Sequence, residues 1–381
     1  TLEPRWNANS LDLVATAGPP PQILFASDSG GGLSVGIYTT DGTGPNATRV
    51  IGLTDLGYER QFPRWSPDRK RIAYSSGSFG SPNALFVMTA SGDTNTVVVN
   101  DTSTFYPRWS PDGRHLGFLC GDGFSQIDVC VIGDVTGPIG SIPLNNYVVV
   151  SDYVPTAWLD GPVAAAWDPL DLDRAVFARD SSDGVNPPTS RFFTGSYTGT
   201  DVQPLHTSIL DVGNGPLQVR GTMDWSADGS MLAFAARDPL GTEKIYVMNA
   251  DGTGLRQLTF LSGLDDGPLF SPDGSEILFG RDESCSYNGW IVDINNTDGS
   301  LERQITDDNI CDFDLDLLAG DWSPDGSEIV LTGFDPTTGW TQIYVVPRTV
   351  TAATYRTLRV LVGRDADAGS WLREIQPSWR P

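Results

Sequence analysis

The sequence predicts an all-β protein, a seven-bladed β-propeller in which four-stranded antiparallel blades form a closed ring. Three observations lead to this fold class. One phrase recurs along the chain, the phrase has the chemistry of a tight β-hairpin, and the two ends of the chain complement each other. Recurrence at such a period is typical of solenoids, propellers and arrays. Rings of six or eight blades are the alternatives.

The repeated phrase is clearest at 107–118, where it reads PRWSPDGRHLGF. Its anchor aromatics are Trp65, Trp109, Trp167, Trp225, Phe270, Trp322 and Trp379. Successive anchors are separated by 44, 58, 58, 45, 52 and 57 residues. The copy at Trp167 is degraded, and the copy at Trp379 comprises an anchor strand alone. The spacing therefore defines seven structural units.

The phrase has a physical logic as a hairpin. Proline presets φ, Asp bonds to nearby backbone, and Gly accepts the positive φ that a reversal needs. An alternating apolar strand follows the turn. The unit that begins at Trp225 predicts strands near Met223–Ser226, Ser230–Ala236, Lys244–Met248 and Leu255–Thr259. Four such antiparallel strands describe a propeller blade.

The two ends of the chain supply one blade between them. Ile23–Ser27, Gly36–Thr40 and Arg49–Leu53 read as three outer strands without an inner one, and Gln376–Pro381 reads as an inner strand with nothing after it. Pairing them closes the ring and removes two exposed sheet edges. We therefore expect a single propeller domain over 21–381, with residues 1–20 as an N-terminal extension that packs against the ring.

The repeat WSADGSMLAF followed by KIYVMNADGTGLRQLT resembles that of the TolB-like propeller family, a relative of the WD-repeat propellers. The resemblance covers almost the whole chain. It implies a propeller fold and a periplasmic scaffold that docks partner proteins at the mouth of the ring. Prolyl-oligopeptidase-type peptidases share the pattern, but their catalytic serine lies in a separate hydrolase domain.

Composition limits the partners. With 24 basic and 48 acidic residues the net charge is −24, which opposes binding to nucleic acid or to anionic membrane surfaces. The acids are dispersed, which fits solubility or a cation-rich setting. No apolar run reaches 18 residues, so we expect no membrane insertion.

Four cysteines allow three pairings. The repeat favours Cys285–Cys311, because both lie in loops on one face of one blade. Cys120 and Cys130 end adjacent strands and would sit out of register, so their bridge stays open. Four free thiols are the other possibility. A disulfide would place the protein in an oxidising compartment, either extracellular, at the cell surface or periplasmic.

Strand direction places the regular Pro-Asp-Gly turns on one face of the ring and the irregular loops on the other. Binding residues concentrate in variable loops on a rigid scaffold, so the irregular face is the predicted functional face. Its aromatic candidates are Trp158, Tyr287, Trp340 and Trp371. These could stack on sugars or anchor a protein partner. Packing of each loop onto its own blade is the structural alternative.

The residue before each anchor is expected to line a central channel. Arg64 and Arg108 lie on adjacent blades, and Asp224 and Asp321 lie elsewhere in the ring. The arginines could bind an anion. Alternatively, all four form salt bridges between blades.

No cofactor is required by the sequence, but Ca²⁺ is a candidate. Asp307, Asp308, Asp312 and Asp314 gather hard oxygen ligands in one loop. A second acidic group lies at Asp168, Asp171 and Asp173. Neither matches the EF-hand pattern, and the alternation with Phe313 and Leu315 also fits a strand with an acidic outer face.

No catalytic motif is present, and the two histidines, His115 and His206, make neither a triad nor a metal cluster. His115 is expected to be a solvated turn residue. We therefore expect a non-catalytic, secreted or periplasmic module that binds a protein partner or assembles with itself into oligomers or filaments. The alternative is a carbohydrate-binding protein or polysaccharide-active enzyme that uses the irregular face.

Overall fold

The structure is a computed structural model. It describes residues 3–4, 13–14, 23–27, 36–40, 48–51, 58–78, 83–121, 127–150, 165–167, 174–181, 189–196, 198, 201–205, 210–213, 215–283, 287–306, 320–335, 340–353, 359–362 and 375–379. Among these residues no helix is long and apolar enough to cross a membrane.

Strand pairing joins the described strands into seven four-stranded antiparallel sheets and one two-stranded ribbon. The ribbon is β1 (Glu3–Pro4) with β2 (Leu13–Val14). In pairing order, the sheets are β30 (Ile375–Trp379), β3 (Ile23–Ser27), β4 (Gly36–Thr40), β5 (Thr48–Ile51); β6 (Tyr58–Trp65), β7 (Arg71–Ser78), β8 (Ala84–Thr89), β9 (Asn95–Val99); β10 (Ser103–Trp109), β11 (Leu116–Gly121), β12 (Ile127–Ile132), β13 (Tyr147–Val149); β14 (Ala165–Trp167), β15 (Arg174–Ser181), β16 (Thr189–Ser196), β17 (Gln203–Pro204); β18 (Gln218–Trp225), β19 (Met231–Arg237), β20 (Glu243–Asn249), β21 (Arg256–Gln257); β22 (Leu264–Phe270), β23 (Glu276–Asp282), β24 (Tyr287–Asp293), β25 (Glu302–Gln304); and β26 (Gly320–Trp322), β27 (Glu328–Asp335), β28 (Trp340–Pro347), β29 (Arg359–Val362).

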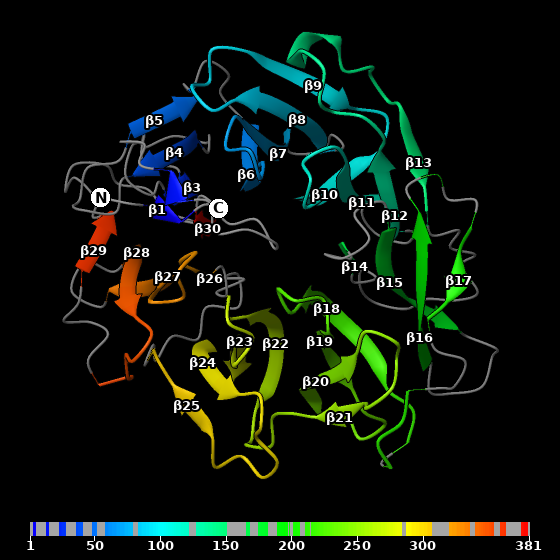
Figure 1. The fold of residues 1–381 in the computed structure, drawn as a ribbon. Coiled ribbons are helices and arrows are strands. Elements are labelled where there is room, and N and C mark those ends of the chain that lie inside the picture. Colours follow the sequence, from blue (N-terminus) through cyan, green and yellow to red (C-terminus); the bar gives the residue numbers. More distant parts are fainter. Residues whose placement is uncertain are drawn as a thin grey trace.

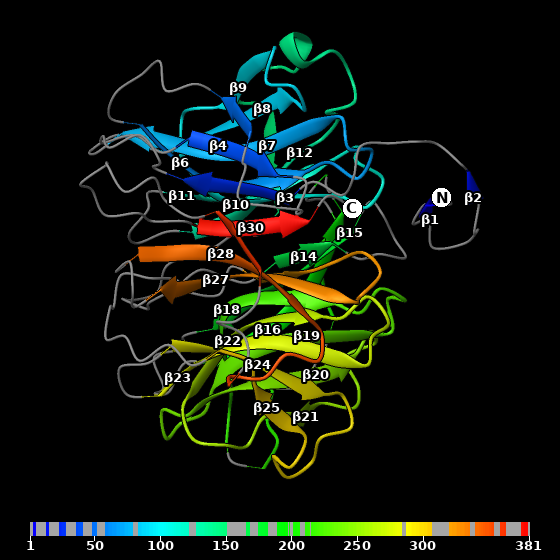
Figure 2. The same ribbon diagram turned by 90° about the vertical axis from the view of Figure 1, so that its left-hand side faces the viewer.

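The sheets stand around a common axis as the blades of a propeller (Figure 1). The first strand of each sheet lies innermost and the fourth lies at the rim. Inner strands of neighbouring sheets contact one another, as β6 does β10 and as β18 does β22. The ring closes where β30 pairs with β3, so that Ile23 lies opposite Trp379 (Figure 2).

The predicted architecture of regular four-stranded blades needs correcting. The rim strands β17 and β21 and the inner strands β14 and β26 contain only two or three residues each. The inner strand β18 is longer than predicted and starts at Gln218. Its register shifts between Arg220 and Met223, and β6, β10 and β22 shift at the equivalent place. Such β-bulges bend a strand and break the alternation that sequence patterns rely on. A 3₁₀ turn, η1 (Ile139–Ser141), also lies between β12 and β13 in the third blade.

The Ser-Pro-Asp phrase forms the same turn in five blades. The hydroxyls of Ser66, Ser110, Ser226, Ser271 and Ser323 each donate to the Asp carboxylate two residues on, at 2.6–2.7 Å. The same hydroxyls accept the backbone N–H five residues on, at 2.8–3.0 Å. These bonds hold the hairpin reversal, so the repeated phrase is structural.

Side chains also join neighbouring blades in a repeated way. The indole N–H of Trp109 donates to the carbonyl of Arg64 at 3.1 Å, and that of Trp322 donates to the carbonyl of Leu269 at 3.2 Å. In each case the acceptor residue comes directly before the anchor aromatic of the preceding blade. Near the rim, Arg303 donates to the carbonyls of Arg348 and Val350 in the next blade. Hydrogen bonds therefore join neighbouring blades both at the axis and near the rim.

Candidate functional site at the ring axis

Four of the residues that precede the anchors interact with one another at the axis. Arg64, Arg108, Asp224 and Asp321 lie on β6, β10, β18 and β26, the inner strands of four blades, and all four are half-buried. Arg64 interacts electrostatically with Arg108 and Asp321, and Asp224 interacts with the same two residues. We call this group, with Phe62 and Tyr106 described below, the axial site. It carries two positive and two negative side chains.

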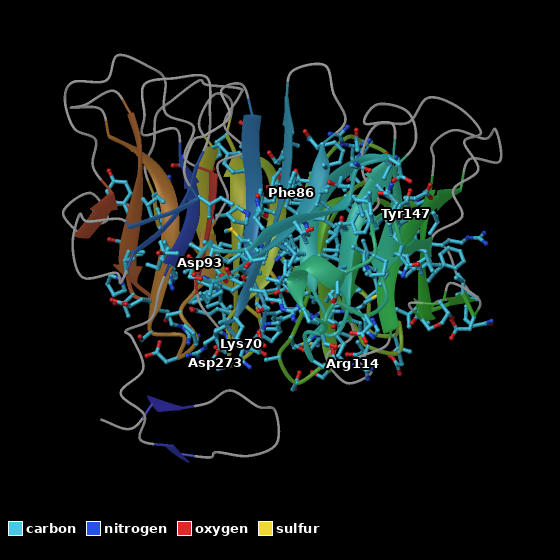
Figure 3. All side chains as sticks on the ribbon, turned by 90° about the horizontal axis from the view of Figure 1, so that it is seen from above. Lys70, Phe86, Asp93, Arg114, Tyr147 and Asp273 are labelled. Atoms are coloured by element: carbon cyan, nitrogen blue, oxygen red, sulfur yellow. A yellow bond between two sulfur atoms is a disulfide. The ribbon has the colours of Figure 1, made fainter. Side chains whose placement is uncertain are left out.

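The axial site lies close to the turn face, which we define as the face that bears the Ser-Pro-Asp turns. Each of its four charged residues precedes the last residue of its inner strand, and the turn follows at once. Figure 3 shows the labelled residues Lys70, Arg114 and Asp273, which belong to these turns, together on one face of the ring. The site therefore lies nearer to the regular turns than to the irregular loops that we predicted to be functional.

Two aromatic residues frame the arginines, and sequence reasoning missed both. Phe62 and Tyr106 occupy the bulges of β6 and β10, with φ of 56° and 50°. Their ring centroids lie 4.2 Å apart across the boundary between the blades. A left-handed backbone is a genuine outlier for a bulky residue. In β22 the equivalent position is Gly267, with φ of 62°, so the aromatic residues are not needed to make the bend.

A sequence signal for these aromatics exists. Phe62-Pro63-Arg64-Trp65 and Tyr106-Pro107-Arg108-Trp109 form a doublet that no other copy of the phrase shares. Strained backbone of this kind costs of order 1–3 kcal/mol per residue and clusters at functional sites. The doublet therefore marks the boundary of these two blades as special.

Arg64 has little to compensate its charge. Burial within the ring and the adjacent charge of Arg108 lower the pKa of Arg64 to about 9, although Asp321 and Tyr106 oppose the shift. Among the described residues its side chain makes one hydrogen bond, from Nη1 to the carbonyl of Pro63 at 3.1 Å, and no ion pair within 4.0 Å. The predicted salt bridge between blades is therefore not formed by Arg64.

Asp224 is also held in an unfavourable place for a charge. Burial raises its pKa to about 6, because Asp321 repels it and because the bond from the Phe270 N–H, at 2.8 Å, and the charge of Arg108 compensate only in part. The bond from Phe270 crosses between blades. A carboxyl with this pKa changes charge near neutral pH and would respond to a cation placed beside it.

Other predicted site residues are less informative. Tyr287 begins β24, and its hydroxyl donates to Asp266 on the inner strand β22 of the same blade, so it supports the blade. Trp340 begins β28, but its side chain lies outside the described part. The remaining predicted residues lie outside the described residues. They are Trp158, Trp371, Asp307, Asp308, Asp312, Asp314, Asp168, Asp171, Asp173, Cys285, Cys311 and His206.

His115 corrects the expectation of a solvated turn residue. Its side chain is buried, with 3% exposed. Its backbone N–H donates to Ser110 at 2.8 Å, and its ring Nδ1 bonds to the carbonyl of Gly133. Two other blades have Arg71 and Met231 at the equivalent position after the turn. Each of these residues begins the second strand of its blade. His115 therefore links its turn to the end of β12. Among the described residues, no three His, Cys, Asp or Glu side chains gather as a metal site would require.

The disulfide in the described part joins Cys120 and Cys130, with Cα atoms 5.9 Å apart. Cys120 lies opposite Asp128 and Cys130 lies opposite Phe118, so the two cysteines are diagonal neighbours on adjacent strands. Their offset is two residues, which is smaller than the sequence suggested. The bridge ties β11 to β12 in the blade that carries Arg108.

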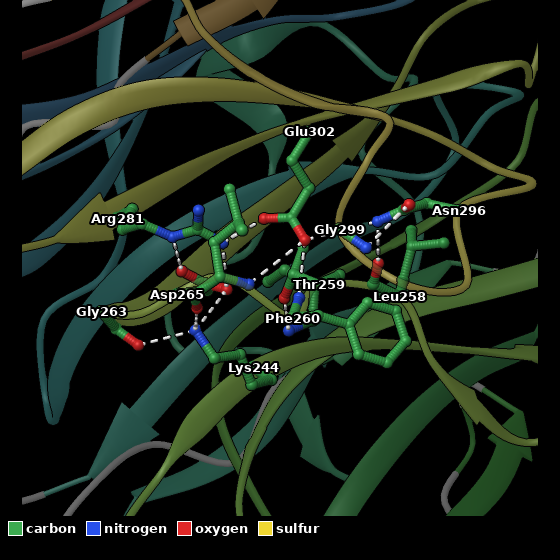
Figure 4. A network of polar contacts seen from close by, with 12 residues as sticks. Lys244, Leu258, Thr259, Phe260, Gly263, Asp265, Arg281, Asn296, Gly299 and Glu302 are labelled. Atoms are coloured by element: carbon green, nitrogen blue, oxygen red, sulfur yellow. Dashed lines mark hydrogen bonds and ion pairs between the residues drawn. The ribbon is translucent and has the colours of Figure 1, made fainter.

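A second charged group is structural. Lys244, Asp265, Arg281 and Glu302 are buried between two neighbouring blades (Figure 4). Arg281 pairs with Asp265 and with Glu302 at 2.6 Å each, and its guanidinium lies 4.4 Å from the ring of Trp290. Burial opposes its charge, but the bonds to both carboxylates outweigh burial and raise its pKa. We call this group the buried network; its charges are compensated internally, unlike that of Arg64.

Comparison with known proteins identifies the fold. No family model matches the chain. An uncharacterized protein of Agrobacterium fabrum is 33% identical over 116 residues, which cover 29% of this chain and about a third, 35%, of that relative. TolB from Acinetobacter baumannii superposes with a TM-score of 0.51 at 16% identity, over 95% of this chain and 67% of TolB. The fold is a TolB-like β-propeller.

Other solved structures share this TolB-like fold. An oligogalacturonate lyase in complex with manganese has a TM-score of 0.55 at 17% identity, over 86% of this chain and 82% of the lyase. A prolyl endopeptidase has a TM-score of 0.51 at 13% identity, over 78% of this chain and 42% of the peptidase. At these identities the similarity concerns the fold alone, so function must be argued from the site.

Proposed function

We propose that this chain is a secreted or periplasmic propeller that binds a partner protein at the ring axis, through the axial site, without catalysing a reaction. The observation that supports it is the gathering of Arg64, Arg108, Asp224 and Asp321 from four blades into one half-buried group, in which burial opposes the charges of Arg64 and Asp224. Charges arranged in this way match a polypeptide segment that carries charges of its own, because complementary charges fix register and specificity.

Two further observations support the proposal. Similarity to TolB favours a protein partner and a periplasmic location, and the Cys120–Cys130 disulfide favours an oxidising compartment. The half-buried ring of Tyr106, packed against the buried Phe62, supplies aromatic surface beside the charges, and aromatic residues are enriched where proteins bind one another.

A second candidate is binding of an acidic carbohydrate. The observation that favours it is again the axial site, because two adjacent arginines beside aromatic rings suit a sugar that bears a carboxylate. The similarity to an oligogalacturonate lyase gives this candidate a fold precedent. It is a different class of function, and the experiment below distinguishes the two.

The test is site-directed photo-crosslinking in a native cell-envelope extract. Tyr106 is replaced by p-benzoylphenylalanine, which keeps an aromatic ring in the axial site. The matched control carries the same replacement at Tyr147 on the rim strand β13 (Figure 3). We expect a discrete protein adduct from position 106 and none from position 147. Equal labelling at both positions, or no protein adduct at position 106, would contradict the proposal.

A further inference from the structure

Arg64 and Arg108 are adjacent cations that the fold brings together. The indole N–H of Trp109 donates to the backbone carbonyl of Arg64 at 3.1 Å, which fixes β6 and β10 beside each other at this level. Both arginines precede the last residue of their strands. Their charges oppose one another, and burial strengthens that opposition. The proximity of these two like charges does not by itself stabilise the folded state.

The described residues compensate the charge of Arg64 only in part. Where this chain uses arginine structurally, it surrounds the guanidinium with partners. Arg281 has Asp265 and Glu302 at 2.6 Å, and Arg348 has Asp273 and Glu276 at 2.7 Å. Arg64 donates once, to the carbonyl of its neighbour Pro63. A guanidinium presents five N–H donors in a planar fork that matches a carboxylate, so most of the donors of Arg64 are left for something else.

The bulges beside the arginines carry bulky residues at a positive φ that glycine adopts without strain. Phe62 and Tyr106 hold positive φ where Gly267 serves the equivalent bulge. Their rings, tilted by 43° to each other, lie two residues before Arg64 and Arg108. The aromatic pair and the arginine pair thus belong to the same two adjacent bulges, and strain of this kind is retained where the surroundings or a function require it.

We infer that Arg64 and Arg108, framed by Phe62 and Tyr106, form an anion subsite that takes a carboxylate from an acidic segment of the partner protein. Two guanidinium groups would donate to the two carboxylate oxygens, and the half-buried ring of Tyr106 would cover the apolar part of the acidic residue. Asp224 and Asp321 lie on the inner strands of two other blades, and their negative charges would direct an anion to the arginines. This inference rests on the proposed function, because it names the chemistry of that partner.

The first arm of the test needs no ligand. Arg64→Gln removes a poorly compensated cation, so we expect the melting temperature at pH 7 to stay the same or to rise. Arg348→Gln is the matched control, because it breaks two ion pairs and should lower the melting temperature. A loss of stability in Arg64→Gln as large as in Arg348→Gln would show that Arg64 is structural and would overturn the inference.

The second arm measures the binding of three defined probes at constant ionic strength. The probes are capped tetraglutamate, capped tetraglutamine and trigalacturonate. Thermal shift and tryptophan fluorescence report binding. We expect tetraglutamate to bind and tetraglutamine not to bind. Charge-assisted hydrogen bonds are worth about tenfold or more in affinity each, so Arg64→Gln and Arg108→Gln should each weaken binding about tenfold or more. Arg114→Gln, an exposed arginine in a turn, should leave binding unchanged.

The outcomes separate the two proposals. If the Tyr106 crosslink captures a protein and the double variant Arg64→Gln, Arg108→Gln captures it equally, the anion subsite is wrong and the proposed function stands. Binding of tetraglutamate that persists in the double variant also overturns the subsite. Binding of trigalacturonate without tetraglutamate overturns the acidic segment as the source of the carboxylate and favours the carbohydrate candidate.

Discussion

At the scale of single residues, the charges of the axial site differ from those elsewhere in the ring in what compensates them. In the turns, hydrogen bonds from Ser226 and Ser230 lower the pKa of Asp228, so that carboxylate is stabilised as an anion. At the axis, burial raises the pKa of Asp224 to about 6. The same residue type is therefore used for stability in one place and left energetically unfavourable in another, which is typical of binding sites.

This difference predicts opposite pH dependences. The folded state of Asp224 holds its proton up to about pH 6, whereas the unfolded carboxyl releases it near 3.8. Stability from this residue therefore falls as pH rises from about 4 to 6 and is constant above. Asp224→Asn removes the charge, retains an acceptor for the Phe270 N–H, and should raise the free energy of unfolding at pH 7 by about 1–3 kcal/mol.

Urea unfolding between about pH 2 and pH 8 measures this effect. The gain in Asp224→Asn should shrink as pH falls through 6 and vanish near pH 4. The control Asp228→Asn should behave in the opposite sense, with a loss of stability above pH 4 that diminishes in acid, because its folded pKa is lowered. An Asp224→Asn variant that is less stable than the wild type at pH 7 would contradict the electrostatic account of the axial site.

At the scale of elements, the contacts between blades combine repeated bonds with one irregular group. The indole bonds at Trp109 and Trp322 recur between blades, but the buried network of Lys244, Asp265, Arg281 and Glu302 is irregular. It connects β20, β22, β23 and β25, and Lys244 also donates to the carbonyls of Leu261 and Gly263 in the connection between the two blades. This connection therefore depends on charge pairs buried beneath it.

Arg281→Met tests that dependence. The substitution leaves two buried carboxylates with fewer partners, and breaking a buried pair in this way costs about 3–5 kcal/mol. The matched control is Arg237→Met, at the end of the equivalent strand β19, whose pair with Glu243 is 41% exposed on the arginine side. That loss should be about 1 kcal/mol or less. Equal losses in chemical denaturation would mean that the network does not hold the two blades together.

At the scale of the whole molecule, the sequence predicts what repeats and misses what does not. The turn chemistry, the pairing of the chain ends and the approach of Arg64, Arg108, Asp224 and Asp321 follow from aligned copies of one phrase. The strained Phe62 and Tyr106, the buried His115 and the offset of Cys120 and Cys130 depend on bulges and register, which leave no periodic signal. The irregular loops favour the face opposite the turns, whereas the position of the charged residues on the inner strands puts the axial site near the turns.

Ring closure is the property of the whole molecule that can be tested most directly. β30 covers the edge of β3, where Ile23 and Leu24 are fully buried, and it also contacts β6, β26 and β27 in the two neighbouring blades. Deleting residues 375–381 exposes that edge and removes the contact between the first and last blades. We expect a melting temperature lower by about 5 °C or more, since each ~1 kcal/mol of lost stability corresponds to ~2–4 °C in chains of 150–250 residues.

Increased association should accompany the lower melting temperature, because an uncovered edge strand pairs with other chains. Deletion of residues 1–14, which contain β1 and β2, is the control and should leave the melting temperature unchanged. Equal melting of the two truncated proteins would mean that the other six blade boundaries hold the ring without β30.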